Sequence, residues 1–85
     1  MKILVIEDEK KLADNICAYL GSAQFTCEVA YDYYEAIEKI HVYEYGCIIL
    51  DITLPRGSGL DILKELKAAK KFRWRADHQR QAFTG

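Results

Sequence analysis

The chain has 85 residues, of which 51% are hydrophobic and 29% are charged. This length allows one small domain, and the composition is that of an ordinary globular protein rather than a disordered, collagen-like or low-complexity one. The net charge of −1 gives no sign of a chain that binds nucleic acids or anionic membranes through a general excess of positive charge. No apolar run approaches the roughly 20 residues that cross a bilayer, and no signal-peptide core follows Lys2.

The three cysteines are Cys17, Cys27 and Cys47. Their odd number and the lack of a Cys-x-x-Cys spacing argue against a disulfide framework and against a zinc site. We therefore expect them to pack as small hydrophobic side chains in a reduced, cytoplasmic protein.

Hydrophobic periodicity in the first half of the chain predicts a strand, a helix and a second strand. Residues 2–6 are a short apolar run, which is typical of a buried parallel strand. From Lys10 to about Ala23, apolar residues recur at three- and four-residue spacing and form one face of a helix. We expect Gly21 and the serine after it to end this helix, because glycine suits the left-handed C-terminal cap. Residues 25–30 predict a shorter second strand.

The second half of the chain repeats this alternation. Asp32 is a good N-cap with Glu35 as its capping-box partner, and we expect the helix that begins there to end near Tyr43. Residues 47–50 predict a third strand, and a third helix begins near Leu60 after a loop that contains the only proline. Strands that alternate with helices of this length are joined by right-handed crossovers, so the sequence predicts an α/β fold with a parallel sheet.

Acidic residues follow the first and third predicted strands. Glu7 and Asp8 come directly after the first, and Asp51 comes directly after the third. Functional side chains of open parallel sheets gather at the carboxyl ends of the strands, and neighbouring strands lie about 4.8 Å apart. If these two strands are neighbours, Asp8 and Asp51 lie side by side at one edge of the sheet.

Such an acidic pocket has a specific chemical use. Three carboxylates in one pocket repel one another unless a cation is bound, and Mg²⁺ suits the pocket because it prefers oxygen ligands and leaves room for a phosphate oxygen. Asp51 is the best candidate for a nucleophile that attacks a phosphoryl group and becomes an acyl phosphate. Asp8 is the best direct metal ligand, Glu7 is a second ligand or acts through water, and the Thr53 carbonyl is a further oxygen ligand. Taken singly, each acid is also compatible with a structural role.

Residues 72–85 differ in composition from the rest of the chain. They contain three arginines and no lysine, whereas residues 1–71 contain eight lysines and one arginine. A basic tail for a nucleic acid or an acidic partner, a linker or cloning remnant, and a stretch translated out of its original reading frame all remain open, and we favour the last. With no Gly or Pro between Leu60 and Thr84, the third helix is also able to continue past Lys71.

Two separated segments of the sequence resemble the receiver domain of two-component response regulators. They are KILVIEDE at residues 2–9 and IILDITLPRGSGLDILKELK at residues 48–67, and the second contains the spacing Asp51-x-x-x-Pro55-x-x-x-Gly59. The resemblance covers about residues 2–70 and looks closest to the group that carries a winged-helix DNA-binding output domain. It implies a flavodoxin-like (CheY-like) doubly wound sheet with strand order 2-1-3-4-5.

The resemblance also implies a function in a phosphorelay. Asp51 matches the position phosphorylated by a partner histidine kinase, Glu7 and Asp8 match the paired acids that hold Mg²⁺, and the Thr53 carbonyl matches the family's backbone ligand. The resemblance further implies a cytoplasmic phosphoprotein that promotes its own phosphotransfer but is not a conventional enzyme. Such a domain has no membrane partner and meets DNA only through an output domain that lies outside this sequence.

Only three βα units are present, with expected strand order 2-1-3, and the family's fourth and fifth units are missing. We therefore expect a partial receiver domain over residues 1–71. Its signalling switch is expected to be defective, because the family's Ser or Thr on the fourth strand and Lys on the fifth have no counterpart. The third strand would be an open edge, which favours pairing with another chain. This predicts a homodimer through that edge or a swapped helix, with Phe72, Trp74 and Phe83 helping to cover exposed apolar surface.

Other functions are weaker interpretations of the same residues. An oligomerisation module would leave the acids idle. A phosphatase of the haloacid-dehalogenase type usually has a second Asp where Thr53 stands, and a dinucleotide site lacks its third glycine at Ile62. Five tyrosines between residues 31 and 45 are interpreted as amphipathic cover for the second helix rather than as a surface for stacking nucleic-acid bases.

Overall fold

The computed structural model describes residues 1–51, 54, 58–69, 73–77 and 80–84. Its elements are β1 (Lys2–Ile6), α1 (Lys10–Ser22), β2 (Thr26–Ala30), α2 (Tyr33–Val42), β3 (Cys47–Asp51), α3 (Ser58–Ala69), β4 (Arg73–Asp77) and β5 (Arg80–Thr84). The first six elements follow the alternation of strands and helices that the sequence predicts. The sequence does not predict β4 and β5. Within the described residues, no helix has the length and apolar character needed to cross a membrane.

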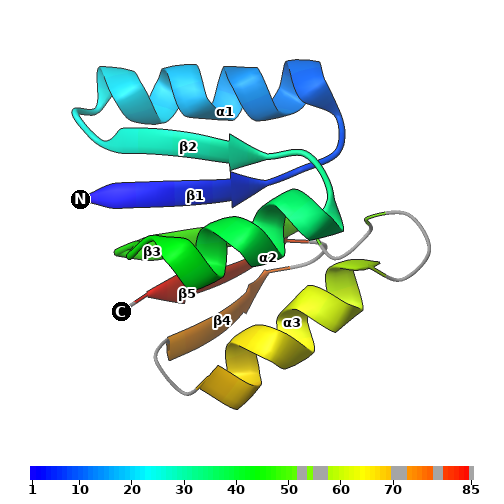
Figure 1. The fold of residues 1–85 in the computed structure, drawn as a ribbon. Coiled ribbons are helices and arrows are strands. Elements are labelled where there is room, and N and C mark those ends of the chain that lie inside the picture. Colours follow the sequence, from blue (N-terminus) through cyan, green and yellow to red (C-terminus); the bar gives the residue numbers. More distant parts are fainter. Residues whose placement is uncertain (52–53, 55–57, 70–72, 78–79, 85) are drawn as a thin grey trace.

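β1 is the centre of a parallel three-stranded arrangement, with β2 on one side and β3 on the other. Leu4 of β1 lies opposite Glu28 of β2 and Ile48 of β3, which defines the register. α1 covers one face of the sheet, and α2 and α3 cover the other (Figure 1). The strand order 2-1-3 with helices on both faces confirms the predicted doubly wound fold.

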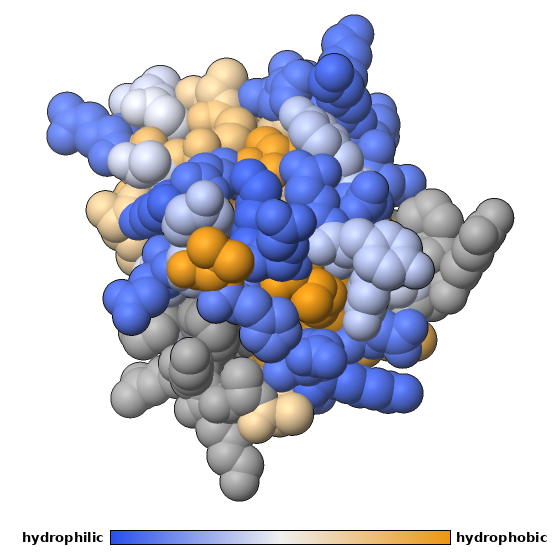
Figure 2. Space-filling view, in the orientation of Figure 1, coloured by the Kyte–Doolittle hydropathy of each residue, from blue (hydrophilic) through white to orange (hydrophobic). Residues whose placement is uncertain are grey.

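The core follows from the apolar run of β1. Ile3, Leu4, Val5 and Ile6 each expose 4% of their surface or less, as expected for a parallel strand covered on both faces. The core cluster consists of Leu4, Ile6, Ala30, Ala36, Tyr45, Ile48, Leu50, Leu54, Ile62 and Leu66. Figure 2 shows that the side of the molecule formed by α2 and α3 is largely hydrophilic, with small apolar patches between polar residues.

β4 and β5 form an antiparallel pair that extends the sheet to the order β2-β1-β3-β5-β4. β5 lies antiparallel to β3, with Thr84 opposite Cys47 and Arg80 opposite Asp51. The expectation that β3 is an open edge is therefore wrong, because β5 occupies that edge. The expected homodimer does not have this edge available for pairing.

The expectation that the third helix continues past Lys71 is also wrong. α3 ends at Ala69, and residues 73–77 are already the strand β4. Arginine and tryptophan in this stretch are compatible with both secondary structures, so periodicity alone did not decide between them. Trp74 and Phe83 are paired positions on β4 and β5, whereas Phe72 lies outside the described residues.

α1 ends at Ser22 as predicted, but the left-handed residue is Gln24 (φ 70°) rather than Gly21. The N–H of Phe25 donates to the Leu20 carbonyl at 3.0 Å, and the N–H of Gln24 donates to the Gly21 carbonyl at 3.0 Å. These two bonds define a Schellman motif. Its left-handed position falls three residues beyond the glycine, so Gly21 takes an ordinary helical place.

The start of α2 confirms the predicted N-cap. The Asp32 carboxylate accepts a hydrogen bond from the Glu35 N–H at 2.8 Å. The Glu35 carboxylate accepts a longer one, 3.5 Å, from the N–H of Tyr31. The capping acid thereby fixes where the chain turns from the end of β2 into α2.

The expectation of three free cysteines is wrong for two of them. Cys17 of α1 and Cys27 of β2 form a disulfide, with their Cα atoms 5.4 Å apart, and only Cys47 of β3 carries a free thiol. The odd number of cysteines does not reveal this pair. The pair forms because the fold packs the middle of α1 against the edge strand β2. Burial raises the pKa of the Cys47 thiol above its ordinary value.

Candidate functional site at the acidic edge

The ends of β1 and β3 are held beside each other by the strand register. Ile6 of β1 lies opposite Leu50 of β3, so the residues that follow them, Glu7 and Asp51, leave the sheet at the same edge. The N–H of Glu7 donates to the Ala30 carbonyl at 3.0 Å, which extends the pairing of β1 with β2 by one residue. Residues 7–9, which we call the acidic loop, therefore start from a residue whose backbone is fixed to β2.

Three carboxylates converge at this edge. Oxygen atoms of Glu7, Asp8 and Asp51 all lie within 4.8 Å of one another. Glu7 exposes only 2% of its surface and Asp51 only 8%, whereas Asp8 is exposed. A hard cation such as Mg²⁺ is suited to this set, because every ligand is a carboxylate oxygen and the exposed side leaves room for water or a phosphate oxygen.

The loop after β3 is only partly described. The N–H of Leu54 donates to the Asp51 carbonyl at 3.4 Å, and the Leu54 side chain is buried in the core. Leu54 is therefore held close to Asp51. Thr53 lies outside the described residues, so its role as a backbone ligand stays a prediction.

A cavity of about 390 Å³ borders the acidic cluster. Its lining consists of Asp8, the four residues Tyr31 to Tyr34, Leu54 and Ser58. Three of these lining residues are tyrosines, and Asp8 brings the acidic cluster to one side of the cavity. This cavity leaves space next to Asp8 for a group that approaches the carboxylates from solvent.

The five tyrosines between residues 31 and 45 do not all serve as amphipathic cover for α2. Tyr34 is 81% exposed and Tyr43 is 51% exposed, whereas Tyr45 is buried. Tyr31, Tyr33 and Tyr34 line the cavity beside Asp8, a position that the sequence does not predict. The rule that located Asp8, that functional residues follow the carboxyl ends of strands, applies equally to the residues after β2.

Tyr31 also connects this region to α1. Its hydroxyl donates to Asp14 at 2.9 Å, and this hydrogen bond, with smaller effects from desolvation and nearby carboxylates, raises the pKa of Tyr31. The Lys10 ammonium lies 5.9 Å from the centre of the Tyr31 ring. One side of α1 is therefore tied to the segment that follows β2.

A doubly wound sheet with carboxylates gathered at the ends of its parallel strands β1 and β3 is typical of open α/β domains, whose ligand sites lie at the carboxyl ends of the strands. The family model of the response regulator receiver domain matches residues 3–73. The chain belongs to this family, which confirms the resemblance seen in the sequence.

Curated relatives are transcriptional response regulators. The transcriptional regulatory protein DltR of Streptococcus agalactiae is 39% identical over 69 residues, which are 81% of this chain and 31% of that protein. The two-component response regulator PhoP of Pseudomonas aeruginosa is 34% identical over 71 residues, which are 84% of this chain and 32% of that protein. The chain thus spans about a third of the length of these relatives.

Solved structures of receiver domains share the fold. The response regulator TrrA of Thermotoga maritima, solved in complex with Mg²⁺ and BeF, matches with a TM-score of 0.76 and 31% identity over 82% of this chain and 61% of that chain. The receiver domain of the Francisella response regulator 1452 matches with a TM-score of 0.66 and 33% identity, over 78% of this chain and 57% of that chain. These neighbours support the arrangement of three βα units.

Proposed function

We propose that this domain is a phosphoacceptor in a two-component pathway and that Asp51 receives the phosphoryl group from a sensor histidine kinase. The observation that carries the proposal is the convergence of Glu7, Asp8 and Asp51 within 4.8 Å in a chain of the receiver family. The Asp51 carboxylate is the nucleophile that forms the acyl phosphate.

We propose Mg²⁺ as the cofactor of this transfer. Glu7, Asp8 and Asp51 would hold it, with the Thr53 carbonyl as a further ligand. Bound there, it would neutralise negative charge on the transferring phosphoryl oxygens. The Mg²⁺ and BeF bound in the TrrA structure support this proposal, because that protein shares the fold over 82% of this chain.

The partners and the location follow from the same proposal. A domain of this kind works in the cytoplasm, where its kinase phosphorylates it, and is not a conventional enzyme. DNA is a partner only of an output domain outside this sequence. A homodimer through an exposed sheet edge or a swapped helix stays a prediction, and β5 occupies the β3 edge that was expected to be open.

We further propose that the signalling switch is defective. In the family, a parallel strand that carries the phosphate-binding Ser or Thr lies beside the third strand. Here the neighbour of β3 is the antiparallel strand β5, so that residue type has no matching position on it. An origin of residues 72–85 from another reading frame is compatible with this replacement.

The test is the reaction with acetyl phosphate and with beryllofluoride, each in the presence of Mg²⁺. With acetyl phosphate, we expect intact-mass analysis to show one added phosphoryl group, located at Asp51 by peptide mapping, whereas beryllofluoride should bind at Asp51 without a covalent phosphoryl transfer. Asp51→Asn should abolish the phosphorylation, whereas Asp61→Asn, an exposed acid at the start of α3, should not.

Mg²⁺ alone should also stabilise the protein. At ten times its Kd, a cation that binds only the folded state adds about 1.4 kcal/mol to the free energy of unfolding. Asp8→Asn should remove this gain. If Asp51 is not modified and Mg²⁺ does not stabilise the wild-type chain, the acids are idle and the alternative of an oligomerisation module is favoured.

A further inference from the structure

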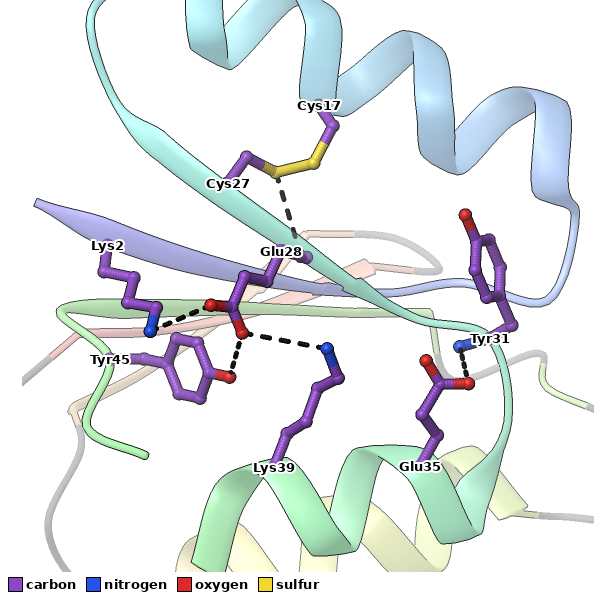
Figure 3. Close-up of polar contacts among 8 residues, drawn as sticks. All are labelled: Lys2, Cys17, Cys27, Glu28, Tyr31, Glu35, Lys39 and Tyr45. Carbon is purple, nitrogen blue, oxygen red and sulfur yellow. Dashed lines mark hydrogen bonds and ion pairs between the residues drawn. A yellow bond between two sulfur atoms is a disulfide. The ribbon is translucent and has the colours of Figure 1, made fainter. Parts of the chain in front are cut away.

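The disulfide between Cys17 and Cys27 connects the middle of α1 to the edge strand β2 (Figure 3). Both residues are half-buried, so a small thiol reagent is able to reach them. Within α1, Ala13 is fully buried, and Leu12, Ile16 and Leu20 are half-buried. The disulfide adds a covalent link between α1 and β2 to this packing and so restricts how far α1 can move relative to the sheet.

A second contact lies on the same side of α1. Asp14 accepts the hydrogen bond from the Tyr31 hydroxyl at 2.9 Å, and residues three positions apart on a helix lie on one side. Asp14 and Cys17 thus face β2 and the segment that follows it. The two contacts tie one side of α1 to β2 and to the residues that line the cavity beside Asp8.

The position of α1 bears directly on the acidic loop. Glu7 directly follows β1 and is held by its hydrogen bond to Ala30, and α1 begins at Lys10. Only Asp8 and Glu9 therefore lie between this fixed residue and the helix. The N–H of Ala13 donates to the Glu9 carbonyl at 2.9 Å, which makes Glu9 part of the first helical turn. Any shift of α1 is therefore passed to Asp8 through one intervening residue.

We propose that Cys17 and Cys27 form a reversible redox site whose disulfide orders the acidic loop and thereby raises its affinity for Mg²⁺. The Mg²⁺ part of this inference rests on the function proposed above. In compartments where thiols are kept reduced, disulfides are usually transient or redox-sensing. A cytoplasmic phosphoacceptor with this bond would thus report the thiol redox state through its metal site.

The chemistry is ordinary thiol–disulfide exchange. A thiolate of a reducing dithiol attacks the sulfur of one cysteine, which forms a mixed disulfide and releases the other cysteine as a thiolate. The second thiolate of the dithiol then attacks the dithiol's own sulfur in the mixed disulfide and releases the first cysteine. Two electrons and two protons pass to Cys17 and Cys27, which become thiols, while the dithiol becomes a disulfide. A disulfide such as oxidised glutathione reverses the reaction and is itself reduced to thiols.

The experiment compares the full chain in its oxidised form with the same chain reduced by dithiothreitol, with free thiols counted in each. We expect amide hydrogen exchange over residues 7–13 to be faster in the reduced form, because α1 opens more readily. By calorimetric titration, Mg²⁺ should bind the reduced form about fivefold more weakly, at the low end of usual coupling between two sites.

Two variants control this comparison. Cys47→Ser keeps the disulfide and should respond to reduction as the wild type does. Cys17→Ser with Cys27→Ser cannot form the bond, so its exchange rates and Mg²⁺ affinity should match the reduced wild type with or without dithiothreitol.

The outcomes separate this proposal from the one on which it rests. If the reduced form melts at a lower temperature but keeps the same Mg²⁺ affinity and the same exchange over residues 7–13, the disulfide only stabilises the fold and the proposal is overturned. If neither form binds Mg²⁺, the metal site itself fails. In that case, faster exchange over residues 7–13 on reduction would still establish that the disulfide orders the acidic loop. Unchanged exchange would refute this part of the proposal as well.

Discussion

At the scale of single residues, Glu28 is a charged, half-buried residue in the middle of β2. Three side chains interact with the Glu28 carboxylate (Figure 3). Lys2 lies at 2.8 Å, the Tyr45 hydroxyl donates at 2.7 Å, and Lys39 lies at 3.7 Å. The hydrogen bond from Lys2 is the largest cause that lowers the pKa of Glu28, followed by that from Tyr45. Desolvation of the Tyr45 ring, with a smaller effect of Glu28, raises the pKa of Tyr45.

The Glu28 interactions should make stability depend on pH in one direction. A carboxylate whose pKa is lowered in the folded state stabilises the fold at pH values above its ordinary pKa of 4.5. This contribution to stability is lost as the pH falls through the folded-state pKa. Glu28→Gln should cost about 1 kcal/mol at pH 7, a modest value because the side chains are about a third exposed.

Urea denaturation of both proteins from pH 7 to pH 3 checks this expectation. The difference between wild type and Glu28→Gln should shrink toward zero below pH 4.5. Glu38→Gln, an exposed glutamate on α2, is the matched control and should show little effect. A gap between wild type and Glu28→Gln that stays constant down to pH 3 would contradict the assigned cause.

At the scale of the elements, the end of α1 stores a small conformational cost. Gln24 has a φ of 70°, a left-handed conformation that costs a residue with a Cβ about 1 kcal/mol. Gln24→Gly should therefore raise the free energy of unfolding by about that amount and the melting temperature by roughly 4–8 °C. Ala23→Gly, one position earlier at φ −89°, removes no such cost and should not stabilise. Thermal unfolding followed by circular dichroism distinguishes them, and equal effects would argue against the left-handed cap.

Proline substitutions, which remove backbone hydrogen bonds, test whether β4 and β5 belong to the sheet. β5 lies between β3 and β4, and a proline within a central strand removes a ladder hydrogen bond. Ala82→Pro in β5 should cost about 3 kcal/mol or more, whereas Ala76→Pro in the edge strand β4 should cost less. Chemical denaturation gives both values. If both substitutions are neutral, residues 73–84 do not belong to the sheet.

At the scale of the whole molecule, the small core leaves little stability to lose. Leu66 of α3 exposes 1% of its surface and belongs to the core cluster, whereas Leu60 on the same helix is 50% exposed. Leu66→Ala should cost about 3 kcal/mol, a large fraction of the total for a domain of this size. Leu60→Ala should cost less than about 0.5 kcal/mol. Equal losses in urea denaturation would mean that α3 does not pack as described.

The three βα units were predictable because each has a strong local signal. The apolar run of β1, the Asp32 cap of α2 and the acids at strand ends belong to short segments whose periodicity or spacing fixes their structure. Once β1 and β3 are neighbours, the convergence of Asp8 and Asp51 follows from strand spacing alone.

Two features that the sequence does not predict, the disulfide and the pairing of β5, depend on contacts between distant segments, whereas a third, the left-handed Gln24, is local. The pairing of Cys17 with Cys27 requires α1 to pack on β2, and an odd cysteine count argues against it. Gln24 is left-handed because of hydrogen bonds back to the last turn of α1, although a glycine three positions earlier is the stronger local signal. β5 finds its partner in β3, and residues 80–84 alone do not reveal which strand they join.

The direction of β5 determines where its last residues lie relative to the three carboxylates. β5 starts opposite Asp51 and runs back along β3 until Thr84 lies opposite Cys47, so the start of β1 and the end of β5 lie on the same side of the sheet (Figure 1). A fluorescent protein or an affinity handle fused next to either of them would sit at the far rim, away from Glu7, Asp8 and Asp51. A pair of dyes at the two ends would likewise report unfolding without touching the carboxylates.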